Sequence, residues 1–239
     1  MNRRYLYAIV GSVPVAPLGV GLAGEPLSFV AEGDVVAVVG ETEDPPLATP
    51  DAIRGHDEIV RRLAEFSEAI LPARFGTVQD APVLMEWLAA TAMGLGEALR
   101  LVAGREQMTL HVYDMGGPDM APHTPPPSAH PGEPGARLEA LGPGARYLAE
   151  RRRHWRQKER VPELEPLRPR LDALVTAERV ELRTTPPLRA SVYHLIERGR
   201  SAEYRDAVES NLDLVAGVRL RVSGPWAPYA FAPARPSMI

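Results

Sequence analysis

The sequence predicts an α+β fold of two domains, each with an antiparallel sheet and a few helices. Two observations lead to this prediction. Short apolar or alternating runs of strand length are separated by longer segments with helical apolar spacing. The chain also has 239 residues and 45% hydrophobic residues, enough for two modest cores. We place the domains at residues 1–105 and 106–239.

The first domain is expected to contain four strands. Segments with strand character lie at residues 5–10, 27–31, 34–39 and 70–78. Gly33 lies between the second and third segments, which predicts a hairpin. Pro72 predicts a kink in the fourth strand.

Two helices complete this domain. Thr49 is a suitable cap for the first, and Asp80 for the second, which is predicted to end near residue 102. Gly94 and Gly96 weaken the second helix by about 1 kcal/mol each. A close packing contact would explain both glycines. The resulting order is β-β-β-α-β-α. It is a modified form of the order β-α-β-β-α-β, which we predict for the second domain.

The second domain is predicted to follow the order β-α-β-β-α-β. Its strands lie at 107–112, 180–183, 189–196 and 218–222, a helical region at about 144–177, and a helix capped by Ser201 before the last strand. This order is that of the split-βαβ, ferredoxin-like fold, which has a four-stranded antiparallel sheet with helices on one face. A proline-rich insertion at about 115–136 is expected to be flexible or disordered.

Composition argues against several classes of protein. Cysteine is absent, which fits a reducing cytosol and removes disulfide and thiolate chemistry. The net charge of -4 gives no overall attraction to nucleic acid or anionic lipid. No transmembrane helix is predicted. Arg3 and Arg4 precede an apolar run that could be a short signal peptide, but a buried first strand fits its length better.

No convergent catalytic or metal-binding set stands out, so we predict a protein that is not an enzyme and has no cofactor. His56, Asp57 and Glu58 suggest acid–base or metal chemistry, but consecutive helical residues point in different directions. Arg74 could bind an anion. The structural interpretation, which we favour, is an ion pair between Arg74 and Asp57 or Glu58.

A basic segment at 151–160 offers one further alternative. Its arginines, with Tyr147 and Trp155 nearby, could bind nucleic acid. The negative net charge favours a solvated helix, and docking on an acidic partner is a separate third possibility. We therefore predict no nucleic-acid partner.

Several separated segments resemble the gas vesicle protein GvpL/GvpF family. The segments are Tyr5-Leu-Tyr-Ala-Ile-Val10, Arg54-Gly-His-Asp-Glu-Ile-Val60, Ile70-Leu-Pro-Ala-Arg-Phe-Gly-Thr-Val78, Gly144-Ala-Arg-Tyr-Leu148 and Ser223-Gly-Pro-Trp-Ala-Pro-Tyr-Ala-Phe231. The third and the last are the most distinctive, and the order spans nearly the whole chain. Ser191-Val-Tyr-His-Leu-Ile196 departs from the family's Asn-x-Ala-Tyr-Leu-Val.

The resemblance implies an accessory or minor structural protein of gas vesicle assembly, which is cytoplasmic or located on the gas vesicle. Its implied partners are the small hydrophobic shell protein and other accessory proteins. The residues expected to matter for structure or interaction are Arg74, Phe75, Gly76, Thr77, Trp226, Tyr229 and Phe231. The alternative is a small-molecule-binding or regulatory ferredoxin-like module. The sequence leaves the oligomeric state open.

Overall fold

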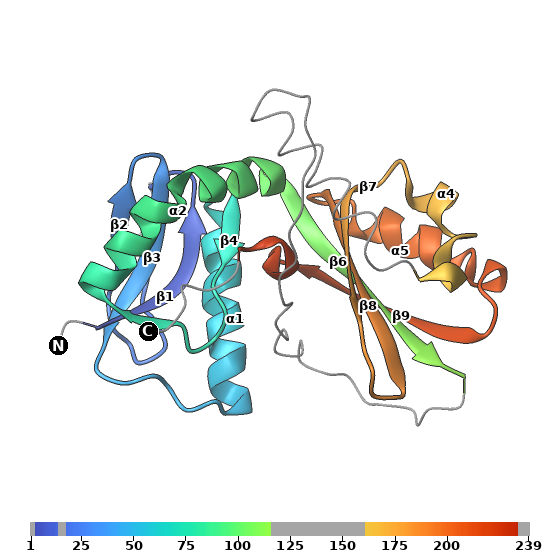
Figure 1. The fold of residues 1–239 in the computed structure, drawn as a ribbon, viewed down its shortest axis with the longest axis horizontal. Coiled ribbons are helices and arrows are strands. Elements are labelled where there is room, and N and C mark those ends of the chain that lie inside the picture. Colours follow the sequence, from blue (N-terminus) through green and yellow to red (C-terminus); the bar gives the residue numbers. More distant parts are fainter. Residues whose placement is uncertain (1–2, 14–17, 116–160, 234–239) are drawn as a thin grey trace. The chain divides into compact units, whose positions relative to one another are not determined.

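The structure is a computed structural model that describes residues 3–13, 18–115 and 161–233 (Figure 1). The chain forms two compact units, one from Met1–Gln107 with Pro225–Ile239 and one from Met108–Gly224. The segment from Pro225 to Phe231, which we name the aromatic tail, therefore belongs to the first unit. The domain boundary predicted from the sequence placed it in the second domain, 106–239. Most of the proline-rich insertion and the whole basic segment lie outside the described residues.

The first unit contains a five-stranded sheet. Four strands lie in the order β2-β3-β1-β4, and β5 also pairs with β1. Strand β1 pairs antiparallel with β3, β4 and β5, and β2 pairs antiparallel with β3. The strands are β1 (Arg3–Val10), β2 (Leu27–Glu32), β3 (Val35–Thr42), β4 (Ile70–Pro72) and β5 (Val78–Asp80). The predicted hairpin is confirmed, with Gly33 in its turn at a φ of 57°.

Helices α1 (Pro50–Glu65) and α2 (Ala81–Val102) flank this sheet. Residues of α1 share one buried cluster with Tyr7 and Val38 of the sheet. Neighbouring strand residues point to the opposite face, and α2 packs against the same strands. Burial on both faces explains why β1 is apolar from Tyr5 to Val10 and β3 from Val35 to Val39.

The helix starts were predicted with different success. Thr49 caps α1 as expected, because its Oγ1 accepts a hydrogen bond of 3.2 Å from the Ala52 N–H. Asp80 occupies the N-cap position of α2 but its side chain makes no capping bond. No close packing contact explains the glycines of α2: a Cβ at Gly94 would meet nothing within 4 Å, and one at Gly96 only the Arg100 guanidinium.

The prediction of one strand over residues 70–78 is wrong. The segment forms the short strands β4 and β5, separated by a loop at 73–77, which we name the 73–77 loop. Thr77 closes a turn on the Arg74 carbonyl through both its N–H (3.2 Å) and its Oγ1 (2.7 Å). Gly76 adopts a φ of 77°, which glycine tolerates best.

The second unit contains a four-stranded sheet in the order β7-β8-β6-β9. Its buried apolar residues come from the sheet and from helical segments that share a single core cluster. The elements are β6 (Arg105–Asp114), η1 (Pro162–Leu164), α4 (Arg168–Leu171), β7 (Val175–Leu182), β8 (Leu188–Glu197), α5 (Ser201–Glu209), η2 (Leu212–Leu214) and β9 (Val218–Trp226), with η3 (Tyr229–Phe231) in the tail.

Three boundaries in the second unit correct the prediction. The helical region does not reach residue 177, because Val175 and Ala177 already pair with β8 as part of β7. Ser201 is the first helical residue of α5 and not its cap, a position taken by Arg200. Strand β9 continues past residue 222 to Trp226.

Candidate interaction site

A buried hydrogen-bond chain joins α1 to the 73–77 loop. The Tyr5 hydroxyl accepts a 3.0 Å hydrogen bond from the Gly76 N–H and lies 2.9 Å from His56 Nδ1. His56 Nε2 lies 3.0 Å from the Ala73 carbonyl oxygen. Because that oxygen can only accept, Nε2 carries the proton and Nδ1 of the neutral ring accepts from Tyr5. The Tyr5 hydroxyl and both ring nitrogens of His56 therefore all have hydrogen-bond partners.

The His56 ring is held neutral by its surroundings. Its side chain is only 2% exposed. Burial lowers the pKa of His56 to about 4, although its bond to the Ala73 carbonyl acts in the opposite direction. A neutral, enclosed and fully bonded imidazole fits a structural role, and it offers neither nitrogen to a substrate or metal.

Aromatic rings enclose this histidine. The Tyr7 ring is stacked on it at 5.7 Å between centroids, and the Phe75 ring meets it edge-on at 5.9 Å. Phe75 also lies 6.3 Å from the Tyr5 ring. Phe75 is partly exposed, so it closes the cluster at the surface of the unit. In the Arg-Phe-Gly-Thr motif, Phe75 thus covers the His56 cluster, Gly76 adopts a positive φ, and Thr77 closes the turn.

The aromatic tail contacts the same region of the first unit. Tyr229 donates a 3.3 Å hydrogen bond to the Asp57 carboxylate of α1, and the Ala230 N–H donates to Gln107 Oε1 at 2.8 Å. Phe231 is 1% exposed, whereas Trp226 and Tyr229 are partly buried. Burial raises the pKa of Asp57, and burial together with Asp57 raises that of Tyr229.

The 73–77 loop and the tail share a small cleft. Its lining includes Arg74 and Thr77 of the loop, Trp87 of α2, and Tyr229 of the tail. The cavity volume is about 40 Å³, far below the roughly 300–1,000 Å³ of a typical small-molecule site. The structure therefore brings the two predicted motifs together. The predicted ion pair of Arg74 with Asp57 or Glu58 stays a prediction.

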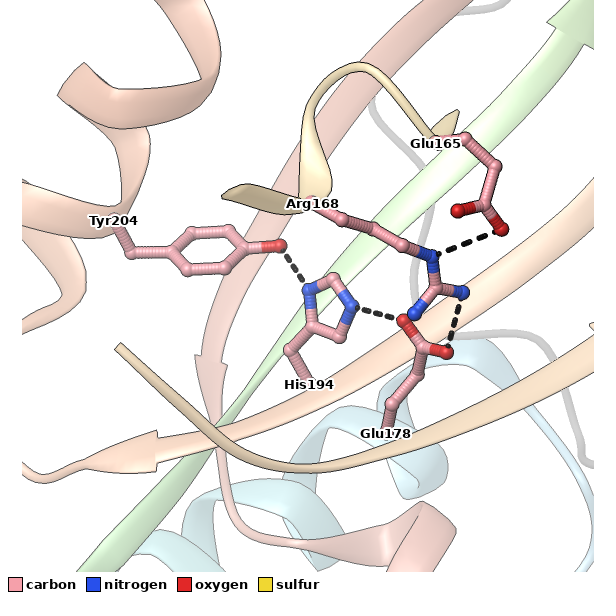
Figure 2. A network of polar contacts seen from close by, with 5 residues as sticks. All are labelled: Glu165, Arg168, Glu178, His194 and Tyr204. Carbon is pink, nitrogen blue, oxygen red and sulfur yellow. Dashed lines mark hydrogen bonds and ion pairs between the residues drawn. The ribbon is translucent and has the colours of Figure 1, made fainter. Parts of the chain in front are cut away.

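A second polar network, which the sequence reasoning missed, lies in the second unit (Figure 2). The His194 ring bridges the Tyr204 hydroxyl (2.6 Å from Nδ1) and the Glu178 carboxylate (2.9 Å from Nε2). Arg168 then links Glu178 to Glu165, at 2.8 and 3.3 Å. The alternation of β8, which places His194 on the face of Ala190, Val192 and Ile196, is the signal that could have revealed it.

This network keeps Glu178 in its charged form. Burial alone would raise the pKa of Glu178, but its hydrogen bond to His194 and the neighbouring Arg168 lower that pKa to about 2. Tyr204 is fully buried, and burial raises its pKa. A Tyr–His–Glu chain can relay protons, but here the tyrosine faces the core, so the arrangement joins α5 to β7 and β8.

Three serines of the second unit are possible nucleophiles, and two of them lie beside His111. Ser191 Oγ is 3.4 Å from His111 Nδ1, and Ser223 Oγ is 3.2 Å from its Nε2. Burial and the charges of Arg221 and Arg183 lower the pKa of His111 to about 4, which makes it a weak base. Ser191 is fully buried. The third, Ser201, begins α5.

Other functional classes gain no support from the described residues. Among them, no group of three or more His, Cys, Asp or Glu side chains is placed to hold a metal ion. No helix that the structure describes combines the length and hydropathy needed to cross a membrane.

Comparison with known proteins gives matches along almost the whole chain. A family described as "Gas vesicle synthesis protein GvpL/GvpF" matches residues 3–233. "Gas vesicle protein L" of Streptomyces sp. (strain CB03234) is 27% identical over 258 residues, which cover 96% of this chain and 92% of the relative.

Two solved structures share the fold. GvpF from Anabaena sp. PCC7120 superposes with a TM-score of 0.66 at 18% identity, covering 98% of this chain and 97% of its own. GvpF from Microcystis aeruginosa gives a TM-score of 0.68 at 15% identity, covering 98% of this chain and 100% of its own.

Proposed function

Because the chain belongs to the GvpL/GvpF family of gas vesicle synthesis proteins, we propose that it supports gas vesicle assembly without being an enzyme. It does so by binding the small hydrophobic shell protein and other accessory proteins, in the cytoplasm at the growing vesicle. The observation that carries this proposal is the family match over residues 3–233, which leaves little of the chain for an unrelated activity.

The state of the reactive side chains supports a binding role. His56 and His194 are buried and bonded through both ring nitrogens. His111 is a weak base flanked by serines. Catalysis requires groups that reach a substrate, and these groups instead hold elements of the fold together. We therefore propose that the protein acts by binding, without a cofactor or a catalytic residue.

The proposed partner surface is the region where the 73–77 loop meets the tail. Arg74 and Phe75 of the loop and Trp226 of the tail are partly exposed, and we expect them to contact the partner. Arginine and aromatic side chains dominate many binding interfaces. Gly76, Thr77, Tyr229 and Phe231, which complete the seven residues predicted from the sequence, would fix the shape of that surface.

The two sheets support a finer description of the fold. The order β7-β8-β6-β9 in the second unit is the strand order of a split-βαβ sheet, with helical segments in a single core cluster. We infer that this unit is ferredoxin-like and that the first is a modified version of the same plan.

The experiment is complementation in cells that carry the gas vesicle genes but lack this one. The chain should restore buoyant cells, and purified chain should retain the shell protein in a pull-down. Arg74→Glu should reduce both. Arg54→Glu is the matched control, because Arg54 is an exposed arginine of the same unit that pairs only with the exposed Asp51 among the described residues. Normal buoyancy without the gene would contradict the proposed role in assembly. Full binding of the shell protein by Arg74→Glu would contradict the proposed partner surface.

A further inference from the structure

The outer face of α2 is apolar although it is exposed. Met93 is 82% exposed, Met85 53% and Val83 42%, and Ala89 and Ala90 are exposed beside them. Solvent-facing helix surfaces are normally polar. The α2 helix, green in Figure 1, therefore presents to solvent a surface suited to packing against another protein.

Three exposed residues on this face follow a seven-residue spacing, with a charged residue at each end and Met93 between them. Glu86, Met93 and Arg100 lie seven residues apart, and all three are exposed. Seven residues are close to two helical turns, so the three side chains form one line along the helix. Among the described residues, neither Glu86 nor Arg100 forms an ion pair.

We propose that α2 packs against α2 of a second copy of this chain, antiparallel and centred on Met93. A two-fold axis at Met93 places Glu86 of each copy opposite Arg100 of the partner subunit, which gives two equivalent ion pairs. A left-handed crossing of about 20° keeps residues of seven-residue spacing facing the partner helix. The interface is isologous, so it closes as a dimer.

Small residues around Met93 would allow the two helices to approach closely. Ala89, Ala90 and Gly96 flank the line on both sides. A Cβ at Gly96 would meet only the mobile end of Arg100, at 3.8 Å, so nothing within the unit requires glycine there. Close approach of a second helix supplies a reason for a residue that otherwise weakens α2.

The charge pattern favours a second copy, and one orientation of it. The equal spacing of Glu86 and Arg100 from Met93 makes the face complementary to itself only when the helices run antiparallel. A parallel pair would place Glu86 against Glu86 and Arg100 against Arg100. One helix face is smaller than the roughly 800 Å² per partner of standard interfaces, so we expect a weak dimer with a dissociation constant on the order of 10 µM.

Sedimentation equilibrium of the purified chain, from about 1 to 300 µM, tests the proposal. The chain should change from monomer to dimer over this range. Glu86→Arg and Arg100→Glu should each weaken the dimer about tenfold or more, because each creates two like-charge contacts. The double variant Glu86→Arg/Arg100→Glu should regain most of the affinity. Glu58→Arg, an exposed change on α1, should leave it unchanged.

Any one of the following outcomes would overturn the proposal. These are a monomer at every concentration, an oligomer larger than a dimer, and a dimer that the single charge reversals do not weaken. A double variant that dimerises no better than the single ones would also reject this antiparallel register. Circular dichroism of each variant, with the helix content of the unchanged chain as reference, separates loss of the dimer from loss of folding.

Discussion

At the scale of single residues, the polar side chains that suggest chemistry in the sequence connect elements of the fold. Tyr5 and His56 together join β1, α1 and the 73–77 loop. His194 joins three elements of the second unit in the same way. An unmade bond of this kind leaves a buried polar group without a partner, which costs more than the bond contributes when it is made.

Replacing Tyr5 by Phe should lower the free energy of unfolding by about 1–3 kcal/mol, because the Gly76 N–H and His56 Nδ1 lose their partner. Tyr113→Phe is the matched control, since among the described residues the Tyr113 hydroxyl makes no hydrogen bond, and its ring keeps its contact with Arg219. Urea unfolding measures both. Equal effects of the two changes would contradict the role given to the Tyr5 hydroxyl.

His56 should make the protein less stable as the pH falls. Its pKa is about 4 in the folded chain and 6.5 in the reference state, so the unfolded chain binds the proton more readily. The stabilisation is complete above about pH 6.5 and is lost as the pH falls toward 4. Between pH 7.5 and 5 this amounts to about 2 kcal/mol.

The measurement compares His56→Gln with the unchanged chain by urea unfolding at several pH values. The variant should be less stable at pH 7.5, but its stability should fall less steeply with pH. His111, which also has a pKa of about 4, contributes equally to both proteins and cancels in the difference. Parallel pH curves for the two proteins would show that His56 does not titrate in this way.

At the scale of elements, local signals predicted most strands and helices, and failed where non-local contacts decide. Thr49 and Gly33 specify their cap and turn from local sequence alone. The 70–78 segment was predicted as one strand from its apolar residues, whereas contacts with Tyr5 and Leu6 hold its middle part in a loop. The start of β7 was likewise read as helix, because its pairing with β8 is not visible in the sequence.

The candidate site could be predicted in part. The motif residues were identified, but their connection through Tyr5 and His56 was not, because residues 51 positions apart meet only in the folded sheet. The network of His194 was missed for the same reason. Its partners come from three separate segments of the chain.

Two glycines should respond in opposite directions to alanine. Gly94→Ala should raise the free energy of unfolding by about 1 kcal/mol, because the new Cβ meets nothing and alanine favours helix. Gly76→Ala should lower it by about 1 kcal/mol or more, because a φ of 77° strains any residue with a Cβ. Thermal or urea unfolding of both variants checks this. Destabilisation by Gly94→Ala would mean that the site is more crowded than described.

At the scale of the whole molecule, the chain leaves the first unit at Gln107 and returns to it at Pro225. The last residues therefore complete the unit formed by the first ones. Phe231 is among the largest fully buried side chains, and Tyr229 packs against the core of the first unit. The stability of the first unit should therefore depend on Tyr229 and Phe231, although a division of the chain at residue 105 would assign both to the second domain.

Phe231→Ala should accordingly destabilise the first unit by about 3 kcal/mol or more, through loss of buried area and the cavity that remains. Hydrogen exchange locates the effect: protection should fall in β1, β3 and β4 and stay unchanged in β6–β8 residues of the second unit. Phe66→Ala, which changes a phenylalanine that is 51% exposed, is the control and should have little effect. Loss of protection confined to the second unit would contradict this assignment of the tail.

The most direct test of the proposed accessory role is the buoyancy of cells that carry all gas vesicle genes except this one. Such cells should sink, the intact chain should restore flotation, and the purified chain should bind the shell protein. Cells that float normally without the gene, together with no binding to the shell protein, would contradict the proposed role. They would mean that this chain shares the fold and family of gas vesicle proteins without the role in assembly.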